Sequence, residues 1–349
     1  MVRGGAATSF ASVGILVLGM HRSGTSALAS VLDALGLDVG SGDGLMRGDV
    51  GNPDGYFEVQ SVAGLDERIL AAYGGRWDIP PLLAPGWANE VDARRFVAEA
   101  RTTFDASFAG SHFVLKDPRM SLLMPLWRQA LLDRVAVVVV VRDPAEVAWS
   151  LALRDGMAPL TGLALWAAYN RTLLAGLDGL PVHVCHYRDL VEHPLDVVAD
   201  VARSLSAWGE LDEVDTDAGA QRIRPDLRRD THPGADPILA EPPASIGELA
   251  EFLGSLNGRH DEFHATAPTP GWWEEPLMNE RRVFVQHYEA ALDERDAQIA
   301  ALLADNAALR AQGEELRSEV TAAIDAVREL EATRAIRLAR AFGRGPATT

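Results

Sequence analysis

A loop with the composition of an anion-binding turn lies near the start of the chain. Residues 19–26 read Gly-Met-His-Arg-Ser-Gly-Thr-Ser, between an apolar run and a helical pattern. The glycine spacing is that of the Walker A phosphate loop, but Thr25 stands where that motif has lysine. A close turn at Gly24 and the first amides of a helix favour an anion, and Arg22 adds positive charge. A purely structural strand-to-helix turn is the alternative. The loop residues expected to hold the anion are Ser23, Gly24, Thr25 and Ser26.

A second segment combines a buried strand, an arginine and a helix. Val135–Val141 contains six valines in seven residues, Arg142 follows it, and Ser150 lies eight positions after Arg142. An arginine at the end of a strand and a serine two turns into the next helix can converge on one phosphate group. The alternative for Arg142 is a surface residue paired with Asp143.

Together the two segments resemble the binding elements of sulfotransferases that use 3′-phosphoadenosine-5′-phosphosulfate (PAPS). Residues 21–27 resemble the family's 5′-phosphosulfate loop, and Arg142 with Ser150 resembles its 3′-phosphate site. The two segments occur in the family's order, roughly 120 residues apart. The resemblance implies transfer of a sulfuryl group from PAPS to an acceptor hydroxyl, leaving adenosine 3′,5′-bisphosphate (PAP), with no metal required.

Three weaker similarities extend the resemblance over about residues 13–230. Residues 116–119 (Lys-Asp-Pro-Arg) resemble an element of bacterial members, and residues 187–194 resemble the stretch after a later core strand. Residues 223–229 resemble a segment whose basic residues reach the 3′-phosphate. The resemblance therefore implies that Arg228 contributes to the cofactor site.

The resemblance also implies a general base that deprotonates the acceptor. Cytosolic members use a histidine near the position of Lys116, but residues 116–119 contain none; other members use a glutamate after the phosphosulfate loop. Glu58 is therefore the first candidate and Asp117 the second. A carboxylate that merely begins a helix is the alternative for Glu58. His21 has two interpretations, a residue that lines the pocket and a purely structural residue, and we favour the second.

Lys116 is the only lysine among the 32 basic residues of the chain. An ammonium is a compact point charge that arginine does not replace at a tight site. Lys116 and Arg119 have two interpretations. They approach the sulfuryl group or the acceptor, which we favour because the lysine is single, or they form ion pairs with Asp117 or loop carboxylates.

The pattern of strands and helices that must position these residues indicates an α/β protein. Apolar strands near residues 14–19, 112–115, 135–141 and 182–185 alternate with helical patterns, which indicates a three-layer P-loop-like fold around a central parallel sheet. We expect an enzyme domain at 13–275 and a long C-terminal helix or coiled coil at 280–342. Residues 1–12 and 343–349 are expected to be disordered.

The tail has a heptad pattern from residue 299 to residue 330. Apolar residues alternate at spacings of three and four, with Asn306 at an a position, which favours a parallel two-stranded coiled coil. A homodimer through residues 299–330 is one interpretation, tethering to a partner is another, and a single helix lying on the core is a third.

Composition limits the remaining functions. The net charge of −18 argues against nucleic-acid binding. The single cysteine, Cys185, precludes an internal disulfide and favours the cytoplasm. We predict no membrane span and find no metal-binding cluster in the sequence. The acceptor is expected to be a carbohydrate or glycolipid hydroxyl, with a tyrosine or small phenol as alternatives. A P-loop kinase or NTPase and a non-catalytic coiled-coil scaffold are the competing functions.

Overall fold

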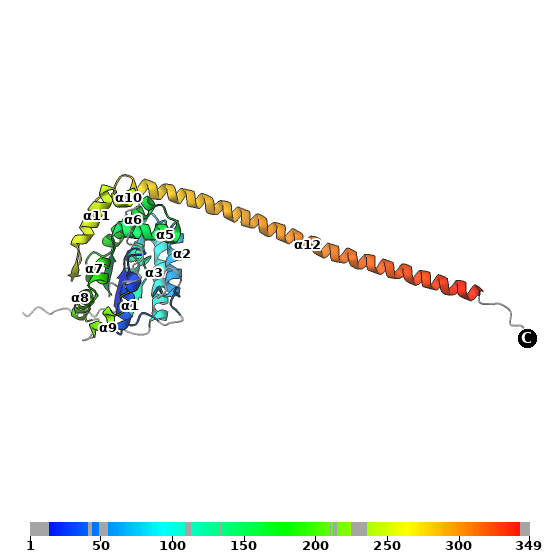
Figure 1. Ribbon diagram of the computed structural model, residues 1–349, viewed down its shortest axis with the longest axis horizontal. Helices are drawn as coiled ribbons and strands as arrows, with labels where there is room; N and C mark the ends of the chain where they lie inside the picture. The colour runs from blue at the N-terminus through cyan, green and yellow to red at the C-terminus, as the bar shows by residue number, and fades with distance from the viewer. Residues whose placement is uncertain are drawn as a thin grey trace, which may run out of the picture. The chain divides into compact units, whose positions relative to one another are not determined.

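The computed structural model describes residues 14–40, 44–48, 55–108, 113–132, 135–209, 211, 215–224 and 236–342. The chain divides into two compact units, Met1–Arg282 and Val283–Thr349. The first unit is an α/β domain and contains every candidate site residue. The second unit consists, where it is described, of the greater part of one long helix (Figure 1).

A five-stranded sheet in the order β2-β1-β3-β4-β5 forms the centre of the first unit. Neighbours among the first four strands are parallel, and β5 runs antiparallel to β4. The predicted α/β fold with a central, mostly parallel sheet is confirmed, and the four predicted strands form within one or two residues of their expected bounds. The strands are β1 (Gly14–Leu18), β2 (Phe113–Lys116), β3 (Val135–Val141), β4 (Val182–His186) and β5 (Gly258–His260).

The strands are buried on both faces, as their continuous apolar runs predict. Alternate side chains of β1 and β3 enter two different cores. Leu16 and Val137 pack in one core with residues of α2 to α6 and α11, whereas Val17 and Val138 pack in the other with residues of α1, α8 and α9. The sheet therefore lies between two helical layers. The α-helices of this unit are α1 (Thr25–Ala34), α2 (Gln60–Ala72), α3 (Val91–Ser107), α4 (Met120–Leu131), α5 (Pro144–Asp155), α6 (Pro159–Gly176), α7 (Tyr187–Glu192), α8 (Pro194–Ala207), α9 (Thr216–Ala220), α10 (Pro237–Ala240) and α11 (Ala244–Ser255).

The last helix, α12 (Glu274–Phe342), begins in the first unit. Glu274 is buried; its carboxylate accepts hydrogen bonds from the Gly271 amide (2.7 Å) and Ser245 (2.7 Å), and it forms an ion pair with Arg171. Arg281 pairs with Asp78 at 2.8 Å. These contacts fix where the helix starts, six residues before the predicted position.

No helix among the described residues is both long enough and apolar enough to cross a membrane.

Candidate functional site

The candidate site lies at the edge of the sheet where β2, β1, β3 and β4 end, which is where parallel α/β sheets bind ligands. The loop between β1 and α1 is held there by Ser121 of α4. The Gly19 amide donates to the Ser121 hydroxyl (3.1 Å), and that hydroxyl lies 3.2 Å from the Gly19 carbonyl, to which it can donate. These hydrogen bonds connect the start of the loop to α4, the helix that follows β2.

Two glycines allow the loop its path. Gly19 has φ of 149°, and a Cβ there would lie 2.5 Å from the Val140 carbonyl of β3. Gly24 has φ of 95°, and a Cβ there would lie 2.2 Å from the ring of Tyr187. Arg22 also adopts a left-handed conformation, with φ of 68°, which is uncommon for a residue with a side chain and tends to mark functional turns.

The loop meets the second segment through Arg22. Its Nε donates to the Ser150 hydroxyl at 2.8 Å, and its carbonyl accepts a hydrogen bond from Nη1 of Arg142 at 2.9 Å. The structure therefore brings Arg22, Arg142 and Ser150 together, although 128 residues separate the first from the last. Arg142 and Ser150 therefore both contact Arg22, and their convergence on one phosphate group stays a prediction.

Arg142 is buried and incompletely paired. Its Nε donates to Glu146 at 2.9 Å, and its guanidinium lies 4.6 Å from the centre of the Tyr187 ring. Its Nη2 is buried and has no hydrogen-bond partner among the described residues. Asp143 instead accepts from the amides of residues 145 and 146 and caps α5, so the alternative of a surface Arg142–Asp143 pair is wrong.

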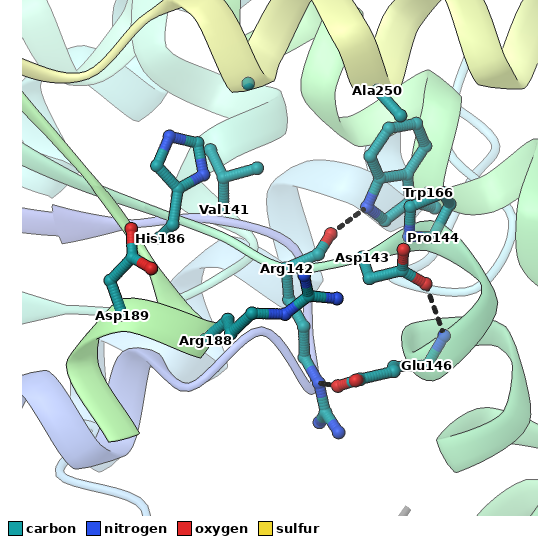
Figure 2. A pocket seen from close by; sticks show the side chains of 11 residues that line it. Val141, Arg142, Asp143, Pro144, Glu146, Trp166, His186, Arg188, Asp189 and Ala250 are labelled. Carbon is teal, nitrogen blue, oxygen red and sulfur yellow. Dashed lines mark hydrogen bonds and ion pairs between the residues drawn. The ribbon is translucent and has the colours of Figure 1, made fainter. Parts of the chain in front are cut away.

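A pocket of about 350 Å³ opens beside Arg142 at the ends of β3 and β4. Figure 2 shows Arg142 and Arg188 on its wall, with His186 at the end of β4 and Trp166 of α6 on the opposite side. The Trp166 indole donates to the Arg142 carbonyl at 3.1 Å. Aromatic surface next to two guanidinium groups suits an aromatic ligand that carries negative charge.

A second cluster surrounds Lys116 at the end of β2. Lys116 Nζ donates to Oε1 of Glu58 at 2.6 Å and to the Tyr56 carbonyl at 2.7 Å. Arg119 donates to three carboxylates: Glu58 (3.1 Å), Asp117 (3.0 Å) and Glu67 (2.7 Å). These contacts match the interpretation in which Lys116 and Arg119 form ion pairs with Asp117 and other carboxylates.

The two candidate bases differ in basicity. Burial raises the pKa of Glu58, but Lys116 and Arg119 outweigh it and hold this pKa below its usual value. Burial raises the pKa of Asp117 to about 6, against the opposing effect of Arg119. Oδ2 of Asp117 is buried without a hydrogen-bond partner among the described residues. Glu58 is therefore ionised at neutral pH, whereas the Asp117 carboxyl group changes its protonation state at a pH only slightly below neutral.

His21 lies beside Arg22 and between two aromatic rings. Its ring centre is 4.8 Å from that of Trp77 and 5.7 Å from that of Tyr169. Burial, reinforced by the nearby cations, holds the pKa of His21 well below its usual value, so this imidazole is neutral at pH 7. Its Nε2 is buried without a partner among the described residues.

The remaining loop residues are placed as follows. Thr25 is buried at the start of α1, the Ser26 hydroxyl donates to the Tyr56 carbonyl (3.2 Å), and the Ser23 amide donates to the Met20 carbonyl (3.1 Å). The amides of Thr25 and Ser26 belong to the first helical turn, where amides lack intrahelical partners. Arg228 lies outside the described residues.

Four residues of the site were not singled out from the sequence. Tyr187 stacks on Arg142 and limits residue 24 to glycine. Glu146 forms an ion pair with Arg142, and Glu67 forms one with Arg119. Asp66 is fully buried and accepts from the Trp127 indole at 2.8 Å. Glu146 had a usable signal, because it lies four residues after Arg142 on the predicted helix. Tyr187 begins the segment 187–194 that resembles the family, but that segment indicated no role for it.

Comparisons with known proteins give distant structural likenesses only. No family model matches the chain, and no curated protein matches its sequence. A sulfotransferase domain from the curacin biosynthetic pathway is 15% identical with a TM-score of 0.33, covering 76% of this chain and 96% of its own. A sulfotransferase from Mycobacterium tuberculosis H37Rv is 15% identical with a TM-score of 0.39, covering 70% and 76%. One from Alicyclobacillus acidocaldarius is 18% identical with a TM-score of 0.31, covering 61% and 87%.

Proposed function

We propose that the first unit is a sulfotransferase that moves a sulfuryl group from PAPS to an acceptor hydroxyl. The observation that carries the proposal is the convergence of Arg22, Arg142 and Ser150 beside the loop at 19–26, with a buried, unpartnered Nη2 on Arg142. A buried guanidinium with a vacant donor is suited to an anion.

The residues present fit both ends of PAPS. The first amides of α1 and the side chain of Arg22 would hold the 5′-phosphosulfate, and Arg142 with Ser150 would hold the 3′-phosphate. Gly24 contributes because a Cβ there would displace Tyr187, and Tyr187 supports Arg142. The bound donor supplies the sulfuryl group and a phosphate leaving group. Arg22 and the loop amides stabilise the negative charge that develops on the leaving oxygen.

Glu58 is the proposed base. It is ionised at neutral pH because Lys116 and Arg119 lower its pKa, so it can accept the hydroxyl proton without first losing one. Lys116 holds Oε1 of Glu58 at 2.6 Å and so fixes the carboxylate direction. Asp117 is the second candidate.

The proposed acceptor is a carbohydrate or glycolipid hydroxyl. A groove of about 490 Å³ borders Arg119, and Arg119 in turn contacts Glu58, so a hydroxyl entering there approaches the proposed base. Gln60 and Glu67 offer hydrogen bonds to a polyol. The groove is lined by Met46, Arg47, Gln60, Ala63, Gly64, Glu67 and Arg119.

Calorimetric titration with PAP, against ATP and Mg²⁺ in parallel, tests the proposal. We expect PAP to bind without metal, more tightly than ATP–Mg²⁺. Preference for ATP–Mg²⁺ would move the chain to the kinase or NTPase class, and binding of neither nucleotide would support the non-catalytic scaffold. Incubation with PAPS and a panel of saccharide, glycolipid and phenol acceptors then identifies the acceptor class.

A further inference from the structure

The second unit presents an uncovered apolar stripe. Along α12 the stripe follows the heptad spacing, and its large apolar side chains are between 46% and 71% exposed. Burial of exposed apolar side chains is favourable and drives association, so the stripe is suited to packing against a partner. The large apolar a and d residues are Ile299, Leu302, Leu309, Leu316, Val320, Val327 and Leu330.

We infer that residues 299–330 form a parallel, in-register, two-stranded coiled coil with a second copy of this chain. The residue types at the seam support two strands. Ile299, Val320 and Val327 are β-branched residues at a positions, and the d positions are mainly leucine, the combination that favours dimers over trimers and tetramers. Gly313, also at an a position, leaves a local gap in the seam.

One pair of opposite charges beside the seam supports a second copy as the occupant. Asp305 occupies a g position, and Arg310 occupies the e position five residues later. In a parallel dimer a g residue lies beside the e residue of the following heptad on the other helix. Asp305 of each copy would therefore pair with Arg310 of the other, twice by symmetry. Neither residue forms an ion pair within the described part of the single chain.

Asn306 fixes the register. It lies at an a position, next to Asp305, where two such amides face each other only if the helices are parallel and unshifted. An antiparallel or shifted pairing would separate the two Asn306 amides and leave each in the seam without the other as its partner, which is unfavourable. The inference uses only residues outside the α/β unit and holds whichever reaction that unit performs.

Charge reversal on the full-length chain tests the pairing. Asp305→Arg alone sets like charges opposite each other in a homodimer, and Arg310→Asp alone does the same. We expect each variant to raise the dimer dissociation constant about tenfold. A mixture of the two variants restores both pairs, so tagged copies should form heterodimers at the wild-type level. Sedimentation equilibrium measures both quantities.

Cysteine cross-linking tests orientation and register. The only native cysteine, Cys185, is buried, and burial raises its pKa to about 12, so it does not compete. Leu309→Cys at a d position should give a disulfide-linked dimer under mild oxidation. Ala311→Cys, on the outer face of the helix two residues later, is the matched control and should remain uncross-linked. Both positions are exposed in the single chain.

Several outcomes would overturn the inference. A monomeric full chain at micromolar concentration would mean that the helix stays single or lies on the core, and a trimer would exclude two strands. A dimer that forms no Leu309→Cys cross-link, or whose mixed charge variants do not prefer each other, would exclude the parallel register. Normal PAP binding in every variant would show that the α/β unit is intact, so this test and that of the proposed function fail independently.

Discussion

Arg119 and Arg142 lie at the same edge of one sheet but in opposite electrostatic situations. Arg119 donates to three carboxylates, and these raise its own pKa. Arg142 donates to one carboxylate, Glu146, and keeps a buried Nη2 without a partner among the described residues. A guanidinium already surrounded by carboxylates does not attract another anion. The difference is consistent with the proposed roles, in which the end of β3 binds the anion and the end of β2 supplies the base.

Replacement of the proposed base gives the largest expected effect. Glu58→Gln should lower turnover by about 10²–10⁴-fold, the usual contribution of general-base catalysis, while PAP affinity changes little. Release of PAP from PAPS in the presence of an acceptor measures the turnover, and calorimetry measures the affinity.

The matched control for this variant is Glu67→Gln. Glu67 contacts the same arginine at 2.7 Å but is 40% exposed, and glutamine at this position can still hydrogen-bond to the acceptor, so turnover should stay within about twofold. Equal losses in both variants would mean that the Arg119 network only positions other groups.

Glu58→Gln is also expected to destabilise the fold by up to about 3–5 kcal/mol, because it removes the carboxylate partner of buried Lys116. Thermal unfolding must therefore show that this variant is folded at the assay temperature.

Replacement of Arg142 gives the next largest expected effect. Arg142→Ala should weaken PAP binding about 100-fold, because charge-assisted hydrogen bonds to a phosphate are lost. Arg119→Ala should leave the PAP dissociation constant within about threefold. Similar losses in the two variants, with both proteins folded, would remove the distinction between the two ends of the site.

A methyl group at the loop glycine should have a smaller effect. Gly24→Ala puts a Cβ 2.2 Å from the Tyr187 ring and forces a left-handed φ on alanine. Tyr187 must then move away from Arg142, so we expect PAP affinity to fall about tenfold. Ser26→Ala is the control, because its hydroxyl bonds to the Tyr56 carbonyl and its loss should leave affinity nearly unchanged. An unchanged dissociation constant in Gly24→Ala would show that Tyr187 does not support Arg142.

Local patterns predicted the parts of the fold that short segments determine. The strand, loop and helix from Gly14 to Ala34 follow from an apolar run, two glycines and one helical period. Helix α6 was not predicted because it is buried on nearly all sides and therefore has little apolar periodicity. Helix α4 contains Pro125, which normally argues against a helix interior, and β5 has three polar or small residues.

The sequence supplied candidate residues for the site but few of the contacts between them. Spacing along one strand and helix predicted that Arg142 and Ser150 lie near each other, and in the structure each contacts Arg22. The contacts of Arg119 with Glu58 and Glu67 join residues 61 and 52 positions apart, which no single-sequence pattern encodes. The pairing of Lys116 with Glu58 likewise depends on how residues 55–58 return to the end of β2.

The pH dependence of turnover is the smallest and most selective effect. If Glu58 is the base, its lowered pKa keeps it ionised from pH 7 to pH 5, so turnover should change less than about twofold. If Asp117 is the base, turnover should fall about tenfold between pH 7 and pH 5, because its pKa is about 6 and protonation removes its activity.

Loss of folded protein at low pH would also lower turnover and must be measured separately. Burial lowers the pKa of His183 to about 4, and because this is below the unfolded value of about 6.5, native stability is lost as the pH falls from about 6.5 towards 4. Circular dichroism at each pH separates the two causes, and a tenfold fall in fully folded enzyme would transfer the base assignment from Glu58 to Asp117.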